Sequence, residues 1–290
     1  MRKYKLNENY FEKIDSKDKA YFLGLLFADG CNAISRTQKH CSIIMSLQEQ
    51  DKEILQKFMN IVSPNKPLQL INNINGQKQY KFVINSKKWS NDLIKLGCVP
   101  NKSLILQFPT EKQVPKEFQS HFIRGYFDGD GCVWNGKRKT MWVKDSRNKN
   151  GGRMRIVHNV KFHFTGCLKL LEDLRTILFM NAHTTFIKIS GPRKNKAFAV
   201  RMLEYSGRGN LKKFYDYIYN NCEDLYIKRK KEKFEEIFCA FDEKSSNETG
   251  LIAGTPEMAI SSQASIEEGS STIPEMEVES SDSKCPALSK

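Results

Sequence analysis

The sequence predicts an α+β fold made of two similar repeats. Residues 20–30 (AYFLGLLFADG) and 121–131 (HFIRGYFDGDG) match each other, and both are apolar helical stretches that end in Asp-Gly. Strand and helix patterns follow each stretch in the same order. We therefore expect two pseudo-symmetric αββαββα-type repeats that pack through these two helices, with antiparallel sheets that form a saddle.

The first repeat is expected at residues 1–118, with a short N-terminal extension before its first helix. Residues 41–48 and 79–84 have the composition of strands, whereas residues 51–62 and 89–96 have the apolar spacing of helices. In residues 51–62 the apolar side chains recur as on one helix face, and a proline follows that helix.

The second repeat is expected at residues 119–244. Its later elements are predicted as strands at 156–164, 184–189 and 197–205, and as helices at 167–178 and 211–220. Residues 135–155 are rich in Gly, Lys, Arg and Asn, which predicts a basic hairpin or a flexible loop. Residues 245–290 contain eight acids, two lysines and many serines with little periodicity, which predicts a disordered acidic tail.

The formal charge of the chain is +14, although the predicted tail is acidic. A basic surplus of this size points to a polyanion, most simply nucleic acid, with a merely solvated basic surface as the alternative. The eight cysteines form no C-x-x-C pair, which favours reduced intracellular thiols and no zinc site. No apolar run is long enough to predict a membrane span.

Small residues recur four positions apart on both motif helices, as Gly24 and Ala28 in the first and as Gly125 and Gly129 in the second. Side chains this small allow two helix backbones to approach closely. The two helices are therefore predicted to pack against each other, so that the interface between the repeats is built from the motifs themselves.

This packing would bring Asp29 and Asp130 together at one end of the helix pair. Gly30 and Gly131 are predicted to end the helices in the left-handed conformation. A carboxylate at a helix C-terminus opposes the helix macrodipole and two nearby carboxylates repel each other, so the placement favours a bound cation. Mg²⁺ takes carboxylates, phosphate oxygens and water, which indicates metal-assisted phosphodiester hydrolysis. A simple Asp-Gly turn is the alternative, but both copies share the pattern.

The two stretches resemble the motifs of the LAGLIDADG homing endonucleases, specifically the single-chain kind with two motifs. The nine-residue signature aligns with residues 22–30 and 123–131, and the resemblance extends over about residues 15–240. It implies that Asp29 and Asp130 bind divalent metal, Mg²⁺ or Mn²⁺, and act in DNA cleavage.

Two positions depart from the family motif, since Phe27 replaces its first Asp and Arg124 replaces its Ala. Asp128 has no acidic counterpart in the first copy and is predicted to be a local capping or interface residue. The resemblance also implies that Gln48 helps to hold water near the metal.

The family resemblance further implies a basic residue near each active centre, after the last helix of a repeat. Lys102 matches that place in the first copy, and Lys230 is the candidate in the second, with Lys228 and Arg229 left open. A lysine beside the scissile phosphate would stabilise the charge of the transition state. The alternative is a lysine that positions phosphate or is simply solvated.

Alternating polar and apolar residues in the predicted strands place one face on the core and the other toward solvent. Outward-facing Arg, Lys, Asn and Gln would read bases in the major groove, each being individually more often a phosphate contact. The candidates for DNA binding are Lys81, Arg155, Lys161, His163, Lys188 and Arg201. The five histidines have no metal-ligand spacing, and none is assigned to catalysis.

The leading interpretation is therefore a monomeric, metal-dependent endodeoxyribonuclease that cuts both strands of a specific DNA site. An RNA-binding intron maturase and a non-cleaving DNA-binding regulator on the same fold are the alternatives. Frequent Lys, Asn, Ile and Phe suggest an A+T-rich genome, as in organelles or phages. An organelle and a bacterial or phage cytoplasm both remain open as locations.

Overall fold

The computed structural model describes residues 2–35, 37, 40–141, 154–191 and 200–252, without the side chains at 138–141, 154–158 and 243–252. Met1–Ser246 form one compact unit and Asn247–Lys290 a second. Both repeats belong to the first unit, apart from the residues after Ser246 at the end of the last helix. No described helix is long and apolar enough to cross a membrane.

The first repeat has the predicted αββαββα order. It contains α1 (Lys17–Asp29), β1 (Gly30–Ile34), β2 (Cys41–Gln48), α2 (Lys52–Val62), β3 (Gln69–Asn72), β4 (Lys78–Asn85) and α3 (Lys87–Lys95). Its strands form one antiparallel sheet in the order β1-β2-β4-β3. Short 3₁₀ turns at Glu49–Asp51, Lys102–Leu104 and Lys116–Phe118 lie between the helices and strands.

The second repeat begins in the same way and then departs from the first. It contains α4 (Gln119–Asp130), β5 (Cys132–Met141), β6 (Met154–Gly166), α5 (Leu168–Ala182), β7 (Arg201–Ser206), α6 (Arg208–Tyr219) and α7 (Lys228–Ile252). Its sheet is antiparallel, in the order β5-β6-β7. The fold class predicted from the sequence is confirmed: an α+β protein of two repeats.

The strand predicted at 184–189 is wrong. His183 ends α5 in the left-handed conformation with φ 54°, and the segment after it is irregular up to a single bridge between Ser190 and Met202. Thr184 and Ile189 are buried whereas Lys188 is exposed. Thr184 and Ile189 therefore anchor an irregular segment to the core, and residues 184–189 pair with no described strand.

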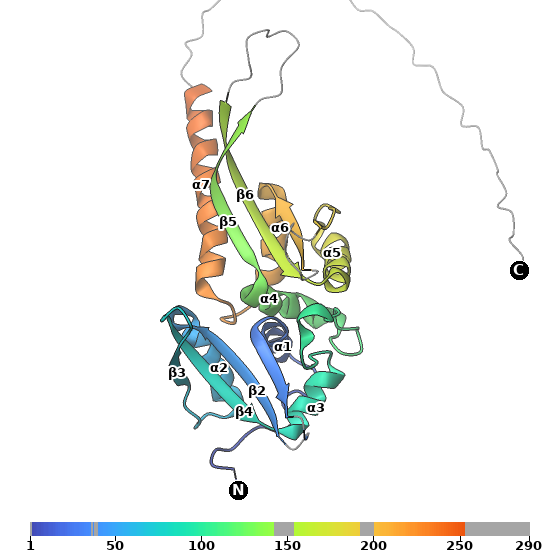
Figure 1. Cartoon of the computed structure of the whole chain (residues 1–290). Helices are drawn as coiled ribbons and strands as arrows, with labels where there is room; N and C mark the ends of the chain where they lie inside the picture. The colour runs from blue at the N-terminus through green and yellow to red at the C-terminus, as the bar shows by residue number, and fades with distance from the viewer. Residues whose placement is uncertain (1, 36, 38–39, 142–153, 192–199, 253–290) are drawn as a thin grey trace, which may run out of the picture. The chain divides into compact units, whose positions relative to one another are not determined.

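Helices α1 and α4 lie side by side between the two sheets (Figure 1). A Cβ atom on Gly24 would overlap the carbonyl oxygen of Phe122, and one on Gly125 would overlap that of Tyr21. A Cβ atom on Gly129 would likewise overlap the Cβ atom of Ala28. The predicted close approach of the two motif helices is confirmed, because only glycine fits at these contacts.

The strands alternate between a core face and an outer face. In β2 the side chains of Ile43, Met45 and Leu47 are buried, and those between them point to the other face. In a strand with this alternation, every second side chain lies on a surface that the core does not cover.

Two predicted segments lie partly outside the described residues. Strands β5 and β6 pair from Cys132 with His163 to Met141 with Met154, so the basic insertion begins and ends as a hairpin, and its residues 142–153 lie outside the described part. Helix α7 continues to Ile252, past the point at which the acidic tail was predicted to begin. The tail prediction is therefore wrong for residues 245–252, and residues 253–290 lie outside the described part.

Candidate active site

Asp29 is the last residue of α1, and Asp130 is the last residue of α4. Both side chains are exposed, although each helix is buried almost all round up to that point. A Cβ atom on Gly129 would lie 3.1 Å from the Oδ2 atom of Asp29, so this carboxylate reaches the end of α4. The helix pair thus places the two acids at one end, as the repeat predicts.

The predicted left-handed helix ends at Gly30 and Gly131 are wrong. Their φ angles are −78° and −82° with extended ψ, which any residue can adopt. Glycine is needed there for space: a Cβ atom on Gly30 would lie 2.6 Å from the carbonyl oxygen of Leu26, and one on Gly131 would overlap the ring of Phe127. The chain turns directly from each Asp into a strand.

A buried lysine lies at the C-terminal end of each motif helix. Lys102 Nζ donates a hydrogen bond of 3.0 Å to the carbonyl oxygen of Ala28. Lys230 Nζ donates to the carbonyl oxygens of Phe127, Asp128, Gly129 and Gly131 at 2.7, 2.6, 3.2 and 2.7 Å. An ammonium group at this end stabilises the helix macrodipole and offsets the neighbouring carboxylates.

Of the two lysines, the one from the other repeat has the larger charge effect on the pKa of each carboxyl group. Desolvation by the surrounding protein atoms and the charge of Asp130 raise the pKa of Asp29 to about 6, and Lys230 opposes this rise more than Lys102 does. Desolvation by the surrounding protein atoms also raises the pKa of Asp130, although the residue keeps access to solvent, and here Lys102 is the larger opposing charge. Lys102 and Asp130 line one cavity of about 230 Å³, together with Tyr126 and Cys167.

The structure separates Lys230 from its two neighbours. Lys228 Nζ pairs with Glu53 at 2.7 Å, and the guanidinium of Arg229 forms three hydrogen bonds of 2.9–3.2 Å to Asp51. Lys230 alone of the three lies at the end of α4. Burial lowers the pKa of its ammonium group.

Gln48 lies at the end of β2 and is exposed. Its side-chain oxygen accepts a hydrogen bond of 2.6 Å from Gln50 Nε2, and no described hydrogen bond joins it to either acid. In the matching register of the second sheet, Cys167 stands where Gln48 stands in the first. Cys167 is buried and donates from Sγ to the carbonyl oxygen of Leu106 at 2.8 Å.

Three buried polar residues near the site were not predicted from the sequence. Asp51 holds Arg229, and its charge acts on Asp29. Asn32 and Arg124 bind backbone groups, as described below. The available signal for Arg124 was a charged residue between apolar neighbours in a motif helix, whereas Asp51 and Asn32 lie in ordinary polar contexts.

The candidates for DNA binding fall into different environments. Lys81, Lys161 and His163 alternate with buried residues and so face outward, with Lys161 Nζ 2.8 Å from Glu204 Oε2. Lys188 is exposed on the irregular segment. Arg201 shares the face of the buried Leu203 and Tyr205, so it does not belong to the outward set. Arg155 is in β6, and its side chain lies outside the described residues.

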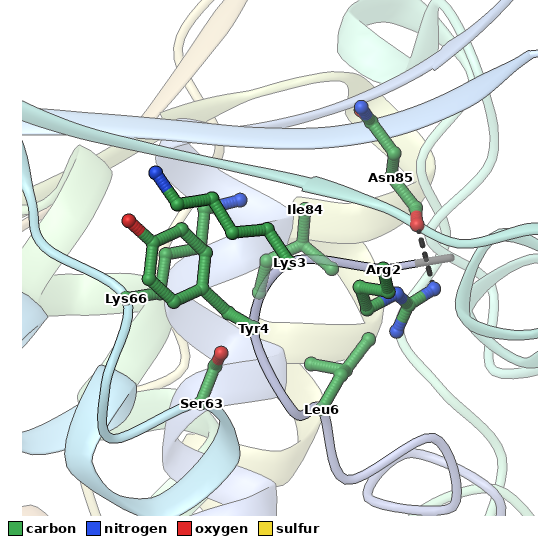
Figure 2. A pocket seen from close by; sticks show the side chains of 8 residues that line it. All are labelled: Arg2, Lys3, Tyr4, Leu6, Ser63, Lys66, Ile84 and Asn85. Carbon is green, nitrogen blue, oxygen red and sulfur yellow. Dashed lines mark hydrogen bonds between the residues drawn. The ribbon is translucent and has the colours of Figure 1, made fainter.

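A second pocket lies away from the acids, at the N-terminal segment (Figure 2). It has a volume of about 430 Å³ and is formed where this segment meets the ends of α2 and β4. Its lining residues are Arg2, Lys3, Tyr4, Leu6, Ser63, Lys66, Ile84 and Asn85. Arg2 donates to the carbonyl oxygen of Asn85 at 2.9 Å, which fixes one wall (Figure 2).

Comparison with known families adds to this geometry. Residues 117–219, from the turn before α4 to the end of α6, match the family model described as a LAGLIDADG-like domain. Over this range the chain is similar to LAGLIDADG-like domains. The matched range holds Asp130 and the second motif helix, and the helix that matches it, α1, ends in Asp29. No curated protein matches the chain.

Solved structures similar to this chain include DNA complexes of homing endonucleases, some of them described as LAGLIDADG homing endonucleases. I-SmaMI bound to cleaved DNA has a TM-score of 0.49 and 11% identity, covering 81% of this chain and 92% of its own. I-WcaI bound to its DNA recognition sequence has a TM-score of 0.48 and 17% identity, covering 78% and 90%. I-LtrWI bound to target DNA has a TM-score of 0.48 and 12% identity, covering 83% and 92%.

Proposed function

We propose that this protein is a metal-dependent endonuclease that hydrolyses phosphodiester bonds in double-stranded DNA. One strand is cut at Asp29 and the other at Asp130, in a single chain. The observation that carries the proposal is the pair of exposed acids at the ends of two packed helices, each with a buried lysine at the same helix end.

The donor groups fit a magnesium or manganese ion. Asp29 and Asp130 supply two carboxylates, and no group of three or more His, Cys, Asp or Glu side chains suited to a metal occurs among the described residues. Mg²⁺ binds through one or two carboxylates and completes its shell with water and phosphate oxygens. Bound there, the ion would polarise the phosphate and lower the pKa of a water molecule.

The protein groups around the acids support the same chemistry. Lys102 and Lys230 place positive charge beside the carboxylates, where the transition state of phosphodiester hydrolysis gains negative charge. The outward residues of the sheets, Lys81, Lys161 and His163 among them, would lie along the DNA and contact its phosphates and base edges.

The test is cleavage of a randomised double-stranded DNA library with Mg²⁺, followed by sequencing of the cut ends. We expect discrete cut sites that disappear in the Asp29→Asn/Asp130→Asn double variant. Asp216→Asn is the matched control, since Asp216 is an exposed carboxylate on α6, and it should cut as the wild type does.

Other outcomes would favour the alternatives. Salt-sensitive DNA binding without cutting, on a library shown to contain the target, would favour a non-cleaving DNA-binding regulator. Tight binding to intron RNA together with absence of cutting would favour a maturase. Cutting that survives in the double variant would contradict the role of the two acids.

A further inference from the structure

The two lysines reach the helix ends by different routes. Lys102 follows α3 in the first repeat, whereas Lys230 lies in the first turn of α7, which has no counterpart among the described elements of the first repeat. The start of α7 is bound directly to α4. Asp128 Oδ2 accepts a hydrogen bond of 2.9 Å from the N–H of Ile227, and the carbonyl oxygen of Ile227 accepts one of 3.0 Å from the N–H of Lys230.

Arg124, one turn before Asp128 on α4, holds the segment that leads into α7. Its Nε donates to the carbonyl oxygen of Leu225 and its Nη1 to that of Ile218, both at 2.8 Å. Arg124 and Asp128 are 0% and 1% exposed. Buried charges of this kind are costly unless hydrogen-bonded, so their partners fix where they lie.

The first repeat uses another device. Phe27 and Leu23 stand at the positions equivalent to Asp128 and Arg124. Instead, the buried Asn32 donates from Nδ2 to the carbonyl oxygens of Cys98 and Ser90, both at 3.3 Å. This ties down the segment that leads to Lys102. The position equivalent to Asn32 in the second repeat is Val133.

We propose that Asp128 is the positioning residue for Lys230, supported by Arg124, and that Asn32 plays the corresponding part for Lys102. The part of this inference that concerns DNA cleavage by the two lysines rests on the proposed function. Without the acceptor at Asp128, the N–H of Ile227 is left unpaired, and the start of α7 is held to α4 only by the hydrogen bonds of Arg124 and of Lys230 itself. Lys230 is then held less firmly at the end of α4, while Lys102 stays in place.

The first test does not depend on cleavage. Lysine acylation of the full chain, read residue by residue by mass spectrometry, should find Lys230 and Lys102 protected, since they are 7% and 9% exposed. In Asp128→Ala the labelling of Lys230 should rise about tenfold or more, with Lys102 unchanged. In Asn32→Ala the labelling of Lys102 should rise instead, with the labelling of Lys230 unchanged. Asp128→Asn keeps an acceptor for Ile227 and should restore the protection of Lys230.

The second test resolves cleavage by strand. Lys230→Met and Lys102→Met define which strand depends on which lysine. Asp128→Ala should slow the Lys230-dependent strand by about 10²-fold, because small displacements of a reacting group have effects of that size, and should spare the other strand. Tyr21→Phe removes only the 2.7 Å hydrogen bond from Tyr21 to Asp128 and should change neither strand.

The outcomes separate the two proposals. Unchanged protection of Lys230 in Asp128→Ala, or equal exposure of both lysines, would overturn the positioning role. Equal slowing of both strands would do the same. If the wild type cuts no DNA, the proposed function fails, and the acylation pattern still decides whether Asp128 positions Lys230.

Discussion

At the residue scale, the carboxylate of Asp29 is a destabilising charge in the metal-free protein. Because its pKa is raised to about 6, the folded state binds its proton more tightly than the unfolded state, whose value is 3.8. The protonated carboxyl contributes to the free energy of unfolding. This contribution is fully present below about pH 4 and is lost as the pH rises through 6. Solvent access and salt keep the effect to about 1 kcal/mol or less.

Asp29→Asn should therefore raise the free energy of unfolding at pH 7.5 in EDTA, measured by urea denaturation. The gain should vanish at pH 4, where the wild-type carboxyl is protonated. Mg²⁺ should stabilise the wild type, because it binds only the folded pair, and should not stabilise the Asp29→Asn/Asp130→Asn double variant. A gain that is the same at both pH values would rule out the charge as its cause.

The sequence predicts those site residues that recur at the same position in both repeats. Asp29 and Asp130 follow from the two matching stretches, whereas the choice of Lys230 over Lys228 and Arg229 required the contacts with Glu53 and Asp51. These partners lie far away in the sequence and form no local pattern. Contacts between residues that lie far apart in the sequence cannot be predicted from local sequence patterns.

At the element scale, the packing of α1 against α4 depends on contact between their backbones. Gly125→Ala would force a methyl group into the carbonyl oxygen of Tyr21, so the helices would have to separate. Overpacking of this kind costs about 1–3 kcal/mol or more. Gly209→Ala is the matched control, since Gly209 lies in α6 with open space where a Cβ atom would stand, and alanine should stabilise the helix by up to about 1 kcal/mol.

Thermal unfolding of the two glycine variants checks this prediction. Gly125→Ala should lower the Tm, and Gly209→Ala should leave it unchanged or raise it. Opposite or equal effects would show that the α1–α4 contact tolerates a side chain.

Most elements followed from local pattern, and the exceptions have physical causes. In the first repeat, β2, α2, β4 and α3 follow from local apolar spacing, whereas β1 and β3 were not located from the sequence, and β3 is exposed at three of its four residues. The strand predicted at 184–189 is wrong because a strand needs a partner, and within the described part of the chain the bridge between Ser190 and Met202 begins just after this segment. A glycine after the helix predicted a left-handed residue at Gly30. The structure requires glycine there for another reason, since a Cβ atom would come too close to Leu26.

At the scale of the whole molecule, the two repeats share one core. The aromatic side chains of α1 and α4 meet across the interface, as Phe27 and Phe122 do with ring centroids 5.0 Å apart. Helix α1 is buried on every side only because α4 covers it, and exposing that face would cost much of the apolar burial of both repeats. Neither repeat can therefore lose its structure without exposing the motif helix of the other.

This sharing predicts that the repeats unfold together. Phe58→Leu, a substitution in the core of the first repeat, should lower stability by about 1 kcal/mol. Hydrogen exchange of the slowest amides in β2 and in β6 should then report the same decrease, although β6 belongs to the second repeat. A decrease confined to β2 would mean that the repeats open independently, and the interface built from the motifs would then be a contact between separate domains.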